Sequence, residues 1–255
     1  MKRLGLLLLC AQFMLVLGLF TVNNKLMLNA SADTVYEHTD LELDSRVSSG
    51  FLPQVVLDLN SAYATTEDKY SELIEQWREV NEDVIGYIEI DEWKISYPVL
   101  QGETNKDYLR TDIYGNYDIA GCVFMDANYP DIYAPVKLIH GHNMKDGSMF
   151  AKLPSLFKYE TLDNAPTIIY TDDLGTKEFK IFAVFSVNDE EEGVIVSEYL
   201  LMDDLQQLKE TYLARSLVPV SEVSESTELL MLNTCWYGKS GKERDLHCII
   251  VAARV

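Results

Sequence analysis

Two short apolar runs of the sequence each lead into side chains that could take part in chemistry. The run Leu229 to Leu232 precedes Cys235, and the run Val136 to Ile139 precedes His140 and His142. A thiol becomes a strong nucleophile when it loses its proton, and a nearby imidazole can take that proton and later deliver it to a leaving group. The two segments therefore predict a cysteine nucleophile with a histidine as its proton partner.

A positive group is also expected near such a thiol. A cation favours the thiolate and stabilises the negative charge that develops on a carbonyl oxygen under attack. Arg244 follows Cys235 by nine residues and stands just before the last apolar run of the chain. We expect it to reach back across the end of the strand that carries Cys235.

Composition narrows the class of protein. The chain has 255 residues, 47% of them hydrophobic, which is enough for one main domain with a substantial core. Its formal charge of −20 argues against nucleic-acid binding, because a phosphate-binding surface needs clustered lysine and arginine. Charge alone leaves open whether the chain is a surface ectodomain or an acidic soluble protein.

The N-terminal segment predicts a membrane anchor. Lys2 and Arg3 precede nineteen residues without charge, Leu4 to Val22. Such a run can cross a bilayer as a helix, and the charges favour an inside N-terminus, which predicts a single-pass protein of the cell membrane with its catalytic domain outside the cell. A cleaved signal peptide ending near Asn29 to Ala32 is the alternative.

The periodicity of the remaining chain predicts a mostly β protein. Apolar residues at helical spacing predict a helix over residues 66–80. Short helices are expected near residues 149–156 and 198–215. Eight short strands predict a closed eight-stranded barrel: Val84 to Ile90, Lys94 to Leu100, Gly121 to Met125, Val136 to His140, Thr167 to Thr171, Glu178 to Val187, Glu228 to Leu232 and Leu246 to Val255. The predicted domains are the anchor (1–25), an acidic spacer (26–50) and a catalytic domain (51–255), helical over about 51–82 and a barrel over about 83–255.

The other cysteines are expected to be inert. Cys10 lies in the predicted anchor, and Cys122 and Cys248 each lie within an apolar stretch. Buried thiols are the simplest interpretation of the latter two, although a disulfide between them is the alternative.

From about Tyr70 to Val255 the sequence resembles the sortases, and within them class B. The resemblance rests on His140-Gly-His-Asn-Met-Lys-Asp-Gly-Ser-Met-Phe150, on Leu232-Asn-Thr-Cys235, and on Val84-Ile-Gly-Tyr-Ile88 with Ile95-Ser-Tyr-Pro-Val99. It implies a sortase-type barrel with N-terminal helices. It also implies that His142 is the catalytic histidine, that Cys235 is the nucleophile and that Arg244 is the arginine, with Asn143 and Thr234 in supporting or substrate-binding positions.

The resemblance implies a cysteine transpeptidase. Such an enzyme cleaves a bond after threonine in the C-terminal sorting motif of a secreted protein, holds the product as a thioester, and transfers it to an amine of the cell-wall precursor or of a pilin. No cofactor and no metal are implied. The final strand departs from the family pattern, because alignment from the C-terminus places His247, rather than Arg244, near the position of the arginine. The permanent charge and forked donors of arginine favour Arg244.

Three other interpretations use the same residues. His140 and His142 could hold zinc together with a cysteine or an acid, but no second pair stands at ligand spacing. A Cys/His peptidase would resolve its thioester with water instead of an amine. A non-enzymatic, membrane-anchored surface-binding ectodomain would keep Cys235 buried and unreactive, with His142 distant from it.

Overall fold

The computed structural model describes residues 66–129, 131–188, 191, 204–238 and 246–255. By its contacts the chain divides into residues 1–57 and 58–255, and the described residues all belong to the second unit. The predicted anchor, the predicted spacer and Arg244 lie outside the described residues.

The predicted localisation is contradicted. Within the described part of the chain, no helix combines the length and the apolar character needed to cross a membrane. The prediction of a single-pass protein with an extracellular catalytic domain rests on the run Leu4 to Val22, which lies outside the described residues.

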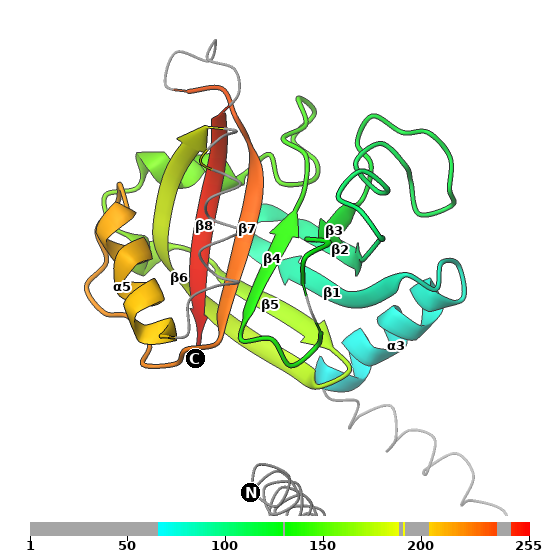
Figure 1. The fold of residues 1–255 in the computed structure, drawn as a ribbon, viewed down its shortest axis with the longest axis horizontal. Coiled ribbons are helices and arrows are strands. Elements are labelled where there is room, and N and C mark those ends of the chain that lie inside the picture. Colours follow the sequence, from blue (N-terminus) through cyan, green and yellow to red (C-terminus); the bar gives the residue numbers. More distant parts are fainter. Residues whose placement is uncertain (1–65, 130, 189–190, 192–203, 239–245) are drawn as a thin grey trace, which may run out of the picture. The chain divides into compact units, whose positions relative to one another are not determined.

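Eight strands form a closed barrel in the order β1-β2-β3-β4-β7-β8-β6-β5, which confirms the predicted fold class (Figure 1). Most neighbours are antiparallel, but β2 and β3 are parallel, and so are β4 and β7. The strand bounds are β1 Val84–Ile90, β2 Ile95–Leu100, β3 Val123–Met125, β4 Val136–His140, β5 Thr167–Asp172, β6 Gly175–Asn188, β7 Leu229–Trp236 and β8 Leu246–Arg254.

Helical elements are few among the described residues. Helix α3 (Thr66–Arg78) packs on β1, with Tyr70 and Ile74 buried, as its apolar spacing predicts. Helix α5 (Leu205–Arg215) is capped by Asp204, whose carboxylate accepts from the first-turn amides, and it lies beside β6 (Figure 1). Short 3₁₀ segments cover 91–93, 153–158 and 162–164. The helix expected near 149–156 is thus a 3₁₀ helix over Leu153–Lys158.

Strand β7 is longer than its apolar run indicates. Pairing with β8 continues from Leu229 opposite Ala253 to Trp236 opposite Leu246. Cys235 therefore lies within the strand, near its end, rather than beyond it. The backbone of a polar segment can extend a strand when a neighbouring strand satisfies its hydrogen bonds.

Side chains alternate between the two faces of β7. Leu230 and Leu232 point into the core of the barrel, whereas Leu229 and Met231 belong to a second cluster that includes Leu208 of α5. Because successive side chains of a strand point to opposite faces, Asn233 and Cys235 continue the outer face and Thr234 the inner one.

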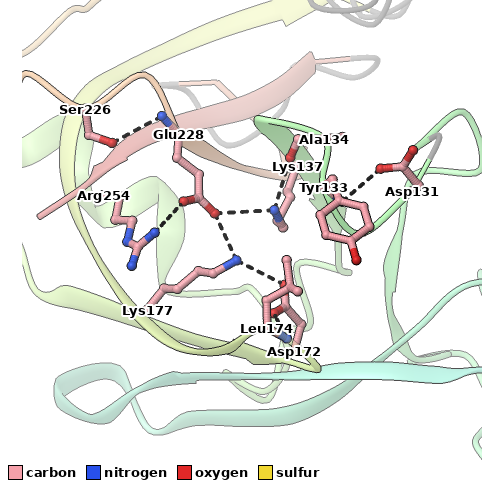
Figure 2. A network of polar contacts seen from close by, with 10 residues as sticks. All are labelled: Asp131, Tyr133, Ala134, Lys137, Asp172, Leu174, Lys177, Ser226, Glu228 and Arg254. Atoms are coloured by element: carbon pink, nitrogen blue, oxygen red, sulfur yellow. Dashed lines mark hydrogen bonds and ion pairs between the residues drawn. The ribbon is translucent and has the colours of Figure 1, made fainter. Parts of the chain in front are cut away.

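A network of buried charges joins the beginnings of β4 and β7 to the β5–β6 hairpin (Figure 2). Lys137, 1% exposed, and Lys177, 6% exposed, lie 3.5 and 3.0 Å from the Glu228 carboxylate. Lys177 is also 3.4 Å from Asp172, and Arg254 is 2.9 Å from Glu228. Lys137 and Glu228 stand at the starts of strands whose other ends carry His140 and Cys235, so this network lies at the end of the barrel away from them.

Candidate active site

The pairing of β4, β7 and β8 brings three predicted site segments together. In the parallel pair, His140 of β4 stands opposite Asn233 of β7. In the antiparallel pair, Cys235 of β7 stands opposite His247 of β8. Side chains of residues directly opposite each other share a face of the sheet. His140, Asn233, Cys235 and His247 therefore lie on one outer face.

The segment that carries His142 is tied to β7 on both sides of the histidine. The Gly141 amide donates to the Asn233 carbonyl at 3.1 Å, and the Asn143 side chain donates to the Cys235 carbonyl at 2.8 Å. The loop folds back so that the Phe150 amide donates to the His142 carbonyl at 2.9 Å. These contacts hold residue 142 beside the end of β7.

Gly141 is required by close packing at this point. A Cβ atom there would stand 2.7 Å from the ring of Phe150, a buried core residue. Any larger residue would displace either the ring or the segment that carries His142.

The His142 ring has a defined partner. Its Nε2 lies 2.9 Å from the carbonyl oxygen of Leu109. A carbonyl only accepts hydrogen bonds, so Nε2 carries the proton and donates it. The Leu109 contact thus fixes both the ring orientation and the tautomer of the candidate proton partner.

His140 belongs to a different hydrogen-bonded chain. Its Nε2 lies 2.9 Å from the Asp126 carboxylate, and its Nδ1 lies 3.0 Å from the Asn233 side-chain nitrogen. The Asn233 side-chain oxygen lies 3.1 Å from Nδ1 of His247. Both ring nitrogens of His140 are thus engaged within the protein. Among the described residues, no group of three or more histidine, cysteine or acidic side chains is arranged to hold a metal.

Asp126 anchors this chain as a buried carboxylate. It is fully buried and accepts hydrogen bonds from His140, from Asn105, and from the backbone and side chain of Asn128. Burial alone would raise the pKa of Asp126, but the hydrogen bond and charge of His140, with the donors of Asn128 and Asn105, outweigh it and hold the pKa well below its usual range. Asp126 is therefore ionised at neutral pH.

Sequence reasoning did not identify Asp126 or Asn233 as site residues. Asp126 follows β3 directly, and Asn233 lies between Leu232 and Thr234, two residues before Cys235. Both are polar residues near strand ends, which is typical of site residues. The contact of each with His140 can be inferred only when the pairing of the strands is known.

The three cysteines within the described residues form no disulfide bond. Cys235 is partly exposed, whereas Cys122 and Cys248 are buried. Burial raises the pKa of Cys122 to about 12, with a contribution from nearby acidic residues, and raises the pKa of Cys248 further. The prediction that these two thiols are buried is confirmed, and the alternative of a bridge between them is wrong.

A pocket of about 530 Å³ lies beside the candidate site. Its lining includes Asn143, whose amide holds the Cys235 carbonyl, Tyr237 just beyond β7, and two lysines, Lys145 and Lys152. The Thr234 hydroxyl is buried and lacks a hydrogen-bond partner among the described residues. The pocket therefore adjoins the loop that follows His142, although neither His142 nor Cys235 is among its lining residues.

Comparison with known proteins identifies the family. The family model for the Sortase domain matches residues 88–255, which are 168 of the 255 residues. This chain belongs to the sortase family. Sortase B of Listeria monocytogenes is 32% identical over 164 residues, which cover 62% of this chain and 65% of the relative. The matched region thus spans slightly less than two thirds of that relative.

Solved structures of class B sortases share the fold. Clostridium perfringens sortase B superposes with a TM-score of 0.63 at 21% identity, covering 71% of this chain and 98% of that one. The Staphylococcus aureus sortase B-substrate complex gives a TM-score of 0.64 at 22% identity, covering 79% and 92%. These structures confirm the eight-stranded sortase barrel, and together with the Listeria relative they make the chain a class B-like sortase.

Proposed function

We propose that this sortase is a cysteine transpeptidase in which Cys235 is the nucleophile and His142 its proton partner. One observation carries the assignment: Gly141 and Asn143 bind the carbonyls of Asn233 and Cys235, so His142 is held next to the cysteine by its two chain neighbours. Membership of the sortase family supports it, as does the partly exposed Cys235 thiol, which is in no disulfide bond.

The reaction proceeds in two steps. The Cys235 thiolate attacks the carbonyl carbon of threonine in a sorting motif, the C–N bond to the next residue breaks, and the leaving amine takes a proton from His142. An amine nitrogen then attacks the thioester carbonyl carbon and gives up a proton to the now uncharged His142, the C–S bond breaks, and the products are an amide and the Cys235 thiolate. Thiol and imidazole suffice for these steps, so we propose no cofactor and no metal.

Three further residues complete the proposed site. Arg244 supplies positive charge near the carbonyl oxygen, because its guanidinium is permanently charged and presents several donors. Asn143 fixes the backbone of Cys235, and Thr234 supports the same strand end from the inner face. The proposed partners are the sorting-motif peptide of a secreted protein and an amine of the cell-wall precursor or of a pilin.

The test uses the full chain, a library of peptides with threonine before the scissile bond, and candidate amines. Cys235→Ala should abolish both the acyl-enzyme, detected by intact mass, and product formation. His142→Ala should slow acylation by about 10²–10⁴-fold, as expected for loss of a general acid–base group. Arg244→Ala should reduce the rate, with partial recovery in Arg244→Lys. An acyl-enzyme that still forms in the Cys235→Ala variant would refute the assignment of the nucleophile.

The products separate this proposal from its rivals. A transpeptidase yields the amide of the added amine, whereas a hydrolytic peptidase yields the free acid at the same rate with or without amine. A surface-binding ectodomain would form no thioester with any peptide of the library.

A further inference from the structure

The pocket beside the candidate site carries the opposite charge to the protein as a whole. Its described lining includes Lys145 and Lys152, together with Asn143 and Tyr237, and the remaining described lining residues are uncharged. These four residues define what we call the lysine pocket. The chain has 41 acidic and 21 basic side chains, so a pocket whose described charged residues are both lysines departs from the composition of the molecule. Such a pocket attracts anions and repels cations.

Neither lysine of the pocket is neutralised by a described neighbour. Both side chains are exposed, and no ion pair or hydrogen bond joins either of them to an acidic residue within the described part of the chain. The buried Lys137 and Lys177, by contrast, share the Glu228 carboxylate. Two like charges around one cavity repel each other, and a bound anion would relieve that repulsion.

The acidic residue of the same turn does not neutralise the lysine pocket. Asp146 follows Lys145 in the sequence, but it is not among the lining residues. Its carboxylate accepts hydrogen bonds from the amide and the hydroxyl of Ser148, at 3.0 and 2.6 Å. These bonds hold the pKa of Asp146 below its usual value. The Asp146 charge is therefore engaged by the turn itself.

The backbone that carries the two lysines is fixed. Asn143 and Met149 face each other in an antiparallel bridge, and the turn between them closes with the Gly147 amide donating to the Met144 carbonyl at 3.1 Å. Gly147 has a φ of 88°, a conformation that glycine adopts without strain. Lys152 directly precedes the 3₁₀ segment Leu153–Lys158. The backbone positions of both lysines are thus set before a ligand binds, which lowers the cost of binding.

The lysine pocket adjoins the candidate nucleophile without including it. Asn143 lines the pocket and donates its side-chain amide to the Cys235 carbonyl at 2.8 Å. Tyr237, on another side of the lining, follows Cys235 by two residues. A ligand group in this pocket would therefore lie beside the strand end that carries the thiol, away from the reacting atoms.

We propose that the lysine pocket binds a carboxylate of a peptide that reacts at Cys235, and that Lys145 and Lys152 are specificity-determining residues for such a substrate. The inference rests on the proposed transpeptidase function. A volume of about 530 Å³ accommodates an acidic side chain or a short peptide end. Lysine attracts an anion as a point charge, and the carboxylate is the anion that peptides carry. No bond forms or breaks in the pocket.

The charge of the whole molecule determines where the effect appears. A chain with a formal charge of −20 repels an acidic peptide at long range, so an acidic substrate depends on local attraction near the thiol. The carboxylate lies away from the scissile bond, and its contact with the lysines is equally strong in the ground state and in the transition state. The preference for an acidic substrate should therefore appear in KM, with kcat little changed.

The carboxylate can come from either substrate, and the test separates the two sources. In the donor arm, the best peptide of the threonine library is made with Glu or with Gln at each position that flanks the motif. In the acceptor arm, the amine is the C-terminal amide of Gly-Glu or of Gly-Gln. We would measure kcat/KM with the full chain and compare the Glu form with the Gln form as a ratio.

The expected ratio follows from two exposed charge pairs. One such pair changes an equilibrium by about 1.4- to 5-fold, so wild type should show a ratio of about 2 to 25 in the arm whose carboxylate enters the pocket. The double variant Lys145→Gln, Lys152→Gln should bring this ratio to about one or below, and Lys145→Glu, Lys152→Glu should lower it further. The wild-type ratio should also shrink in about 1 M NaCl, where the Debye length is about 3 Å.

The matched control is the double variant Lys69→Gln, Lys180→Gln, which changes the net charge equally at two exposed lysines outside the pocket. It should keep the wild-type ratio, and a fall equal to that of the pocket variant would overturn the proposal. A wild-type ratio below about 2 in both arms would also overturn it, as would retention of more than half of the preference in the Gln pocket variant. Acyl-enzyme formation on Cys235 with the uncharged peptides in wild type tests the proposed transpeptidase function separately.

Discussion

Replacing Glu228 with glutamine would test how far the buried charge network stabilises the barrel. The carboxylate, 20% exposed, is shared by Lys177 at 3.0 Å, Lys137 at 3.5 Å and Arg254 at 2.9 Å. The pair with Arg254 contributes little, because that side chain is 47% exposed and surface pairs are typically worth about 0–1 kcal/mol. The two lysines are almost fully buried, so their pairs with Glu228 determine how much stability the Glu228→Gln variant loses.

Loss of the shared carboxylate removes the negative charge that balances the buried positive charges of Lys137 and Lys177. Breaking a buried ion pair costs about 3–5 kcal/mol, because the remaining charge stays desolvated. Lys177 keeps Asp172 and Lys137 keeps the Ala134 carbonyl at 3.1 Å, which places the expected loss near the lower end, at about 3 kcal/mol. Burial and the charge of Lys177 already lower the pKa of Lys137, so this amine can lose its proton and reduce the cost.

Urea unfolding followed by tryptophan fluorescence would measure the difference in the free energy of unfolding. The matched control is Glu225→Gln at an exposed position, which is expected to lie within about 0.5 kcal/mol of wild type.

Burial alone would raise the pKa of Glu228, but Lys177, Arg254 and Lys137 outweigh it and the pKa lies below its usual value. A carboxyl with a lowered pKa stabilises the fold above its ordinary pKa of about 4.3 and loses this contribution as the pH falls through the folded value. The gap between wild type and variant should therefore be constant near neutrality and shrink in acid. A loss below about 1 kcal/mol at neutral pH would refute the reasoning.

Two more predictions concern the candidate site. Alkylation of the folded protein near pH 8 should modify Cys235 but leave Cys122 and Cys248 unmodified until the protein is unfolded, because burial raises the pKa of both thiols. Peptide mapping would measure the alkylation rate at each cysteine, and equal rates at Cys122 and Cys235 would contradict this prediction. Gly141→Ala should lower transpeptidation strongly and stability by about 1–3 kcal/mol, because its Cβ would meet the Phe150 ring at 2.7 Å; unchanged kinetics would show that the loop carrying His142 can shift without cost.

The barrel could be predicted because each strand has a local signature. Short runs rich in Val, Ile and Tyr, separated by polar turns, identify strands without knowledge of their partners. The end of β7 could not be predicted in this way, because Asn233, Thr234 and Cys235 are not apolar and their strand conformation depends on pairing with β8.

Of the candidate site, only the residues that stand in a recognisable sequence motif could be predicted. Cys235 and His142 stand in segments that resemble a known family, and the structure places their segments side by side. The link from Asp126 to His247 spans residues far apart in the sequence and depends on which strands are neighbours. Strand order and register are properties of the whole barrel, so no local pattern could reveal that link.

Strand register also explains why Asn233 suits its position between two histidines. Asn233 contacts His140 across the parallel pair and His247 across the antiparallel pair. An amide offers a donor and an acceptor on one rigid plane, so it distinguishes its two neighbours by the direction of the hydrogen bond. A carboxylate there would accept from both rings and favour a positive charge on each, whereas a hydroxyl could reverse its direction. Of these three groups, only an amide donates to one ring nitrogen and accepts from the other, so His140 and His247 keep opposite hydrogen-bonding roles.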